Sequence, residues 1–229
     1  MSEIWNSLIE IKDYLIESFE NTGVEIHEHG MDKFNHGGWV NRVWTSDDYR
    51  RAHIDIVDAR DKKGLWMMHC CVFPHISSDG PIFGFDVIAG KNKMTGAFHD
   101  FSPTTNNEHE MIVNFADYVS NLDWKKEREL PDWAKAIFST HMVAAGNVSS
   151  IDESHQVLEM VKDNLDYYLE EIGNTIGRSS DEIGVKCQNR YAHFQKENPH
   201  TPRTMMALGL KEDEVNEFIE ICLFPEIKV

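Results

Sequence analysis

Two histidines and two aspartates whose side chains can transfer protons lie in one central stretch of the sequence, residues 51–86. His53 and Asp55 are two residues apart. His69 lies in the next apolar run, and Asp86 lies in the run after that. Successive side chains of a β-strand point to opposite faces, so His53 and Asp55 share one face if the first run is a strand. Because burying a charge without a partner is costly, we interpret the four groups as a candidate acid–base site. The alternative is that the two histidines are hydrogen-bonded core residues.

The pattern around these residues predicts an antiparallel meander. Three apolar runs are separated by turn-forming clusters at residues 58–64 and 74–81. Asp86 lies between Phe85 and Val87, which predicts a desolvated carboxyl group whose pKa is raised toward neutrality, as a general acid requires. Histidines titrate near physiological pH and can relay protons, which suits His53 and His69 to a supporting role.

Composition bounds the class of protein. The chain has 229 residues, 41% of them hydrophobic, without an internal repeat or a low-complexity linker, which predicts a single domain over residues 1–229. No apolar run approaches the roughly 20 residues that span a bilayer, and the N-terminus lacks the order of a signal peptide, so we expect a cytoplasmic protein without a membrane partner. Four scattered cysteines do not suggest a disulfide framework or a zinc site. A formal net charge of −17 argues against nucleic-acid binding.

Periodicity and turn signals predict helices before and after a β-rich region. Ser2 is placed to cap an amphipathic helix, Ser150 and Glu153 match a capping box, and Thr201 followed by Pro202 is a typical helix start. This order favours an α/β fold, a three-layer α/β/α sandwich with a central, mostly antiparallel sheet. The expected strands lie at residues 25–29, 39–44, 51–86 as a meander, 94–101 and 137–144, and the expected helices at residues 2–20, 108–120, 150–172, 179–198 and, in two short pieces, 201–223.

Two segments of the meander resemble motifs of a known enzyme family. Ferredoxin-dependent bilin reductases carry an HCxxFP segment, which is similar to His69-Cys-Cys-Val-Phe-Pro in this chain. They also carry a DLPxFGxDxxA segment, which is similar to Asp79-Gly-Pro-Ile-Phe-Gly-Phe-Asp86-Val-Ile-Ala. The resemblance is greatest to the phycocyanobilin:ferredoxin oxidoreductase branch and its compact phage-encoded members. Further matches follow in chain order at residues 100–103, 138–139, 195–198, Thr201 and 223–224.

The resemblance implies catalytic roles. By this resemblance, Asp86 is the residue that donates protons to the tetrapyrrole. His69 is the histidine that hydrogen-bonds the lactam edge. The family's H-x-E motif falls on His53 and Asp55, so the glutamate that serves vinyl reduction is replaced by a side chain one methylene shorter. This departure favours phycoerythrobilin, formed through 15,16-dihydrobiliverdin, with phycocyanobilin as the alternative product.

The resemblance also implies a substrate and a partner. Biliverdin IXα would be reduced in proton-coupled single-electron, radical steps by a reduced [2Fe-2S] ferredoxin, and we expect a monomer with no bound cofactor and no metal. Thr95, Asn198, His200 and Arg203 are the expected substrate contacts, Arg203 being a candidate for a propionate. Many family members carry a second aspartate after the position of Asn198, where this chain has Pro199, and His200 is the nearby substitute.

An acidic ferredoxin would need a local basic surface on this acidic chain. Two groups of basic residues are candidates: Arg50, Arg51, Arg60, Lys62 and Lys63 around the meander, and Lys186, Arg190 and Lys196 along one predicted helix.

Two other functions fit parts of the pattern. His53, Asp55 and His69 imitate the two-histidine, one-carboxylate set of a non-haem iron oxygenase, although that fold would need more strands and fewer C-terminal helices. A non-catalytic bilin carrier would bind the pigment without reducing it, and an acid in an apolar site favours chemistry over carriage.

Overall fold

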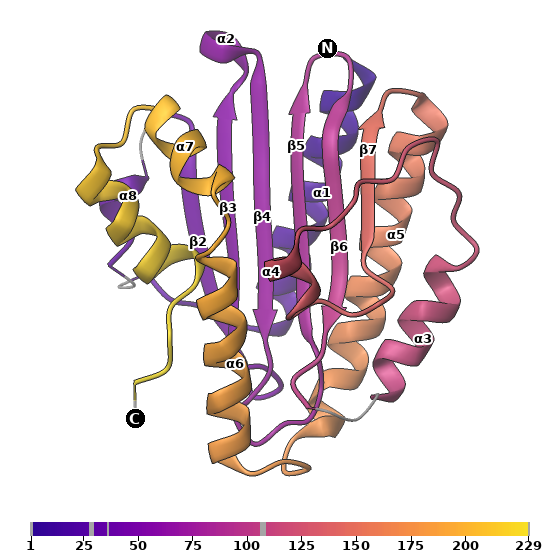
Figure 1. Ribbon diagram of the computed structural model, residues 1–229, viewed down its shortest axis with the longest axis vertical. Coiled ribbons are helices and arrows are strands. Elements are labelled where there is room, and N and C mark those ends of the chain that lie inside the picture. Colours follow the sequence, from indigo (N-terminus) through magenta and orange to yellow (C-terminus); the bar gives the residue numbers. More distant parts are fainter. Residues whose placement is uncertain (1, 28–29, 36, 106–108, 229) are drawn as a thin grey trace.

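The computed structural model describes residues 2–27, 30–35, 37–105 and 109–228. Its centre is a seven-stranded sheet in the order β1 to β7, in which every strand pairs antiparallel with the next one along the chain. The prediction of an antiparallel meander is confirmed and extends to the whole sheet (Figure 1). The strands are β1 (Val24–Glu25), β2 (Trp39–Thr45), β3 (Arg51–Ala59), β4 (Leu65–Phe73), β5 (Ile82–Gly90), β6 (Met94–Ser102) and β7 (Val143–Val148).

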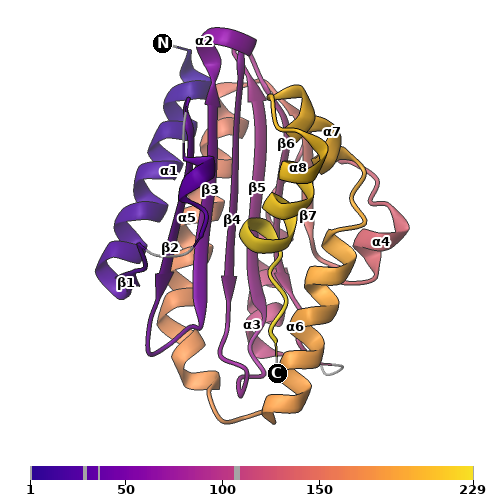
Figure 2. The same cartoon turned by 90° about the vertical axis from the view of Figure 1, so that its left-hand side faces the viewer.

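Helices cover both faces of the sheet, which confirms the predicted three layers (Figures 1 and 2). One face carries α1 (Glu3–Thr22), α3 (Glu110–Val119) and α5 (Ile151–Glu171), and the other carries α4 (Asp132–Lys135), α6 (Asp181–Gln195), α7 (His200–Ala207) and α8 (Glu212–Phe218). A π-helical turn, Ile219–Leu223, continues α8. The remaining short elements are α2 (Arg60–Lys63) and the 3-10 turns Asp32–Phe34 and Ile172–Thr175. Among the described residues, no helix has both the length and the apolar character needed to cross a membrane.

The alternation of side chains along the strands divides the interior into two parts. On β3, Ala52 and Ile54 are fully buried in the larger apolar core under α1 and α5. His53 and Asp55 are equally inaccessible but belong to the opposite face, toward α6, α7 and α8. A smaller apolar core built around Phe218 holds α8 to that second face. The chemistry-bearing residues therefore lie between the sheet and the C-terminal helices.

The predicted helix N-caps were correct where the capping bond joins residues close together in the sequence. The Ser2 hydroxyl accepts a hydrogen bond from the Trp5 amide, and the Ser150 hydroxyl accepts one from the Glu153 amide and donates one to the Glu153 carboxylate. Helix α3 follows His109, whose Nδ1 accepts from Met111; Glu108, where the predicted helix began, lies outside the described residues.

Several predicted element boundaries are wrong. The helix predicted to start after Ser179 is capped by Ser180, and α7 begins at His200, where the Asn198 side chain accepts the amide hydrogen in place of a Thr201 cap. The strand predicted at residues 137–144 begins at Val143. The strand predicted at residues 25–29 is the short β1, and its positions 28 and 29 lie outside the described residues.

The strand predicted at residues 137–144 fails because Ser139 has a tertiary partner. Its amide and its hydroxyl both donate to the buried carboxylate of Asp100 on β6, at 3.0 and 2.5 Å. The Ser102 hydroxyl donates to the same carboxylate. This contact holds residues 131–142 across the sheet as turns and the short helix α4, so that the chain reaches the sheet only at β7.

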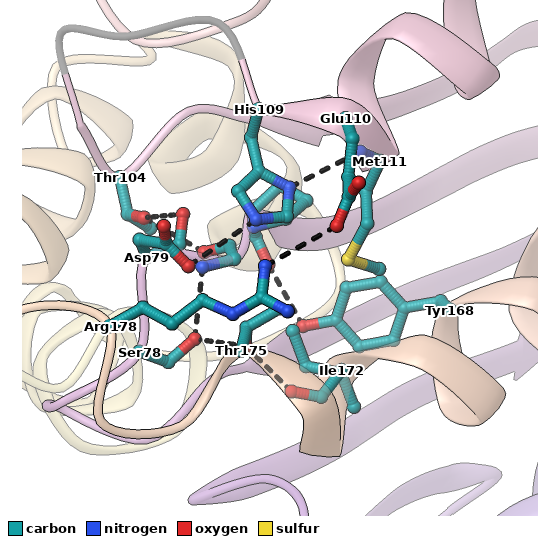
Figure 3. Close-up of polar contacts among 12 residues, drawn as sticks. Ser78, Asp79, Thr104, His109, Glu110, Met111, Tyr168, Ile172, Thr175 and Arg178 are labelled. Carbon is teal, nitrogen blue, oxygen red and sulfur yellow. Dashed lines mark hydrogen bonds and ion pairs between the residues drawn. The ribbon is translucent and has the colours of Figure 1, made fainter.

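A polar cluster holds the turn that leads into β5 (Figure 3). Asp79 lies 3.3 Å from Nε2 of His109, and Thr104 donates to the carbonyl of Gly80. Tyr168 of α5 donates to the carbonyl of Pro81. These contacts tie the turn to α5, to the N-cap of α3 and to the segment that follows β6. The first residues of the Asp79-Gly-Pro segment therefore have a structural role: they set where β5 starts, and hence where Asp86 falls along it.

Candidate active site

Asp55, His69 and Asp86 form a row across the three central strands. Asp55 of β3 is directly opposite His69 of β4, which is directly opposite Asp86 of β5. Directly paired residues of adjacent strands have side chains on the same face, about 5 Å apart. The predicted convergence of these groups is confirmed, and it follows from strand register.

Hydrogen bonds orient each member of the row. Nδ1 of His69 lies 2.8 Å from Oδ1 of Asp86, while Nε1 of Trp39 donates to Oδ1 of Asp55 at 2.6 Å. Behind the row, Nε2 of His53 lies 2.9 Å from the side-chain oxygen of Asn41. Nε2 of His69 is buried and has no hydrogen-bond partner among the described residues. A buried ring nitrogen without a partner beside a cleft is a position for a ligand group.

The two carboxyl groups differ in exposure, and the prediction that Asp86 is desolvated is wrong. The Asp86 side chain is 46% exposed, because strand alternation turns its neighbours Phe85 and Val87 into the opposite core. Asp55 is the desolvated acid: its burial raises its pKa to about 7, against the opposing effects of the Trp39 hydrogen bond and the charge of His69.

The charge on His69 is favoured by its neighbours. Burial of the ring acts to lower its pKa, but the charge and hydrogen bond of Asp86 together with the charge of Asp55 outweigh it, so the pKa is raised above the ordinary value. His69 therefore holds a proton more tightly than a free imidazole, between one exposed and one buried carboxyl group.

A cleft of about 260 Å³ opens beside the row. Its floor is the sheet, including Asp55, His69 and Asp86. One wall comes from α6, α7 and the end of the π-helical turn, and the other from residues 128–142, which include α4. The lining is mostly apolar; its larger side chains are Met67, Ile88, Phe98, Leu130, Trp133, Phe138, Met142, Met205, Leu223 and Phe224. Such a lining with a few polar groups on one side is typical of a site for a large, mostly apolar ligand.

The predicted substrate residues divide into two groups. Asn198 and His200 line the cleft. Thr95 does not, because its hydroxyl turns back to the carbonyl of Ile88. Arg203 is exposed on α7, where Thr204 and Met205 face the cleft instead. His53 is fully buried and outside the cleft lining, so it can act only through other residues.

Several residues of the site were missed from the sequence. Trp39 and Asn41 alternate on β2 and could have been identified by applying the strand rule one strand further. Arg128 lies in a charged connection without regular periodicity, so no local signal marks it. Among the described residues that line the cleft, Arg128 is the one with a fixed positive charge, and its guanidinium lies 5.6 Å from the centre of the Phe98 ring.

The iron-site alternative finds no support in this arrangement. Each of the three proposed iron ligands is instead hydrogen-bonded to another side chain: Asp55 to Trp39, His69 to Asp86, and His53 to Asn41. Within the described part of the chain, no three histidine, cysteine, aspartate or glutamate side chains are grouped so as to hold a metal ion.

The two predicted docking clusters are also altered by tertiary contacts. Arg50 bonds the side chain of Gln188, and Arg51 bonds the carbonyl of Cys222, so neither is free for a partner. Lys196 is neutralised by Glu220 and Glu226. Lys186 keeps an exposed position on α6, and Arg190, also exposed, donates to the carbonyl of Ala136.

Acid and imidazole groups in a row beside an apolar cleft define a site for adding protons to a large unsaturated ligand. The family model for ferredoxin-dependent bilin reductases matches residues 3–225. The chain belongs to this family of oxidoreductases, whose electron donor is ferredoxin.

Individual relatives agree with this assignment. The chain is 29% identical over 192 residues to the phycocyanobilin:ferredoxin oxidoreductase of Synechococcus sp. (strain CC9902), and 30% identical over 193 residues to that of a strain of Prochlorococcus marinus. Each match covers 80% of this chain and 74% of the relative.

Two solved structures share the fold. A PcyX structure is 36% identical, with a TM-score of 0.73 over 96% of this chain and 99% of the other. The phytochromobilin synthase of tomato, solved in complex with biliverdin, is 18% identical, with a TM-score of 0.71 over 93% of this chain and 81% of the other, a likeness that extends to the fold alone.

Proposed function

We propose that this chain, as a single domain over residues 1–229 and as a monomer, reduces biliverdin IXα to phycoerythrobilin through 15,16-dihydrobiliverdin, with electrons from a [2Fe-2S] ferredoxin. The reaction would take place in the cytoplasm, that of the host if a phage encodes the protein. The observation that carries the proposal is the His69–Asp86 pair, with its unpartnered ring nitrogen, at an apolar cleft. A fold neighbour solved with biliverdin supports this choice of substrate.

The reaction needs four electrons and four protons. Each reduced ferredoxin supplies one electron. Two electrons and two protons convert biliverdin to 15,16-dihydrobiliverdin, and two more of each convert 15,16-dihydrobiliverdin to phycoerythrobilin. Adding single electrons gives radical intermediates, and each must receive a proton at a chosen carbon. Positioned acids and exclusion of water are therefore the protein's contribution.

We assign the proton donor role to Asp86 and the lactam contact to His69. Asp86 is in the cleft lining and is hydrogen-bonded to His69, so a proton lost by one can be shared by the other. A flat ligand over Asp86 would remove its water and raise its proton affinity, which is the condition that a general acid needs. Asp55, with a pKa of about 7, carries a proton for part of the population at neutral pH and can donate it to the second region of the pigment. His53 supports the row from beneath, with its ring hydrogen-bonded to Asn41 and its ring centre 6.1 Å from that of His69.

The product assignment depends on Asp55. Its side chain is one methylene shorter than the glutamate of phycocyanobilin-forming relatives, and the bond from Trp39 draws it toward β2. A shorter and tethered acid is less able to reach the exovinyl group, which favours phycoerythrobilin over phycocyanobilin.

The ends of the ligand have separate polar partners. Arg128 on one wall is the candidate for a propionate, since a guanidinium can bind a carboxylate with two parallel hydrogen bonds. Asn198 and His200 on the opposite wall are available to the lactam edge or the other propionate. The cleft volume of about 260 Å³ is just below the roughly 300–1,000 Å³ of ligand pockets, so we expect the two walls to separate when the pigment enters.

A single anaerobic turnover tests the proposal. Biliverdin IXα and reduced ferredoxin are mixed with the protein, spectra are recorded, and the products are separated by chromatography. We expect 15,16-dihydrobiliverdin first and phycoerythrobilin after it. Bound biliverdin that remains unreduced would indicate a carrier and would overturn the proposal.

The substitution Asp86→Asn tests the proton donor. The variant should bind biliverdin but form product about 100-fold more slowly or stall at a radical, because a positioned acid contributes about 10²–10⁴-fold. Asp58→Asn, on β3 outside the cleft lining, is the matched control and should turn over normally. Full product formation by Asp86→Asn would refute the role of Asp86.

A further inference from the structure

Arg51 at the start of β3 is held in an unusual environment. Its Nη2 donates to the carbonyl of Cys222 at 2.8 Å, whereas its Nη1 is shielded from solvent and has no hydrogen-bond partner among the described residues. No carboxylate within the described part of the chain forms an ion pair with it. Desolvation lowers its pKa to about 10, so the guanidinium still carries its charge at neutral pH.

The partner of this charge is a helix end. Cys222 lies in the π-helical turn that continues α8, and the last carbonyl groups of a helix lack partners within the helix. They also carry the negative end of the helix dipole, which stabilises a cation. The π-helical turn is closed by the bond from the Phe224 amide to the carbonyl of Ile219. Arg51 therefore caps the C-terminus of the last helix, which belongs to the helical layer on the site's face of the sheet and lies toward β2 (Figures 1 and 2).

The capped turn leads directly into the cleft. Leu223 and Phe224, the next residues along the chain, both line it. The Phe224 ring meets the His69 ring edge-on, with 5.5 Å between the ring centres and 81° between their planes. The Cys222 carbonyl that Arg51 holds thus lies two residues before the ring that packs on His69.

Arg51 also shares its strand face with the site. Residues 51, 53 and 55 alternate onto the face of β3 that His53 and Asp55 occupy. The positive charge of Arg51 acts against protonation of His69, opposing the two carboxylates of the row. The titratable and charged groups on the elements around His69 are Asp86 of β5, Asp55, His53 and Arg51 of β3, Cys71 of β4, Cys222 of the π-helical turn, Tyr191 of α6, His200 of α7, and Arg128 and Glu129 of the opposite wall.

We propose that Arg51 is a positioning residue of the reductase, which caps the last helix so that Phe224 packs on His69 and which places a fixed positive charge on the strand face of the catalytic row. It acts through these residues and does not touch the substrate. The inference rests on the proposed site, but part of its test needs neither substrate nor turnover.

Three variants separate the two effects of Arg51. Arg51→Met removes the charge and the cap. Arg51→Lys keeps the charge but loses the planar group that reaches Cys222 while retaining packing. Arg50→Met is the matched control, because Arg50 is the adjacent residue but its guanidinium bonds Gln188 of α6 and lies over the ring of Phe73. Thermal unfolding of each variant establishes that it is folded.

The first measurement is the titration of His69 by histidine-selective NMR in the protein without ligand. Arg51→Met should raise the pKa of His69 relative to wild type, while Arg51→Lys and Arg50→Met should leave it unchanged. An unchanged titration in Arg51→Met would overturn the charge effect.

The second measurement is biliverdin affinity by absorbance titration. Arg51→Met and Arg51→Lys should both bind about tenfold more weakly, the effect of losing one charge-assisted hydrogen bond, and Arg50→Met should bind as wild type does. Wild-type affinity in Arg51→Lys would overturn the positioning role. If wild type bound biliverdin without reducing it, the proposed function would fail while both measurements on Arg51 would still be interpretable.

Discussion

The substitution Asp55→Asn should increase the free energy of unfolding, and more at pH 8 than at pH 5. Asp55 is buried, and its pKa is raised from the ordinary value of 3.8 to about 7. Below pH 3.8 the folded and unfolded chains both hold the proton, so the difference in pKa has no effect. Between 3.8 and about 7 the unfolded chain releases a proton that the folded chain retains. The free energy of unfolding therefore falls as pH rises through this range.

The magnitude follows from the shift. A rise from 3.8 to about 7 costs the folded state about 4 kcal/mol once both states are ionised, and about 3 kcal/mol of this falls between pH 5 and pH 8. Asparagine has the same shape, carries no charge and can still accept the hydrogen bond from Trp39. The variant should therefore lack this part of the pH dependence.

Urea unfolding at half-unit steps from pH 5 to pH 8, followed by tryptophan fluorescence, measures the effect. The control is Asp58→Asn on the same strand, where the hydrogen bonds of Arg60 lower the pKa of the carboxyl group. The Asp58–Arg60 ion pair is largely at the surface, so its loss should lower the free energy of unfolding by less than about 1 kcal/mol. Parallel curves for wild type and Asp55→Asn across this pH range would refute the reasoning that Asp55 is a desolvated acid.

Three further changes probe the cleft and the connection that forms one of its walls. Arg128→Gln should weaken biliverdin binding about tenfold in an absorbance titration if it pairs with a propionate, whereas Arg203→Gln, on the exposed side of α7, should not; equal affinities would contradict the assignment. Ser139→Ala should lower the free energy of unfolding by about 1–3 kcal/mol in urea, because the buried Asp100 loses a hydroxyl donor, and an unchanged value would show that this hydrogen bond is not needed. Asp55→Glu should yield some phycocyanobilin in chromatography of the products, and its complete absence would argue against chain length as the cause of the product choice.

Local sequence patterns predicted much of the fold. Period-two alternation identified β3, β4 and β5, whereas the alignment of His69 and Asp86 with Asp55 depends on the register between the strands. Within β3, alternation assigned His53 and Asp55 to one face, since strand geometry alone requires this. The Ser2 and Ser150 caps were identified for the same reason, because each bond joins residues three apart. The failure at residues 137–144 has the opposite cause, since Ser139 bonds Asp100, which is 39 residues away.

The sequence by itself determined which residue types are present, which strand face carries them and, through the resemblance, which chemistry they suit. Only the tertiary structure decided which carboxyl group is desolvated. Asp55 lies between Ile54 and Ile56 as Asp86 lies between Phe85 and Val87, so the flanking residues do not distinguish them. Asp55 is the buried acid because the apolar cluster around α8 packs on the β2 and β3 side of the sheet, whereas the side chain of Asp86 is open to the cleft. Desolvation depends on what packs on a strand from elsewhere in the chain, and flanking residues on a strand point away from the group they flank.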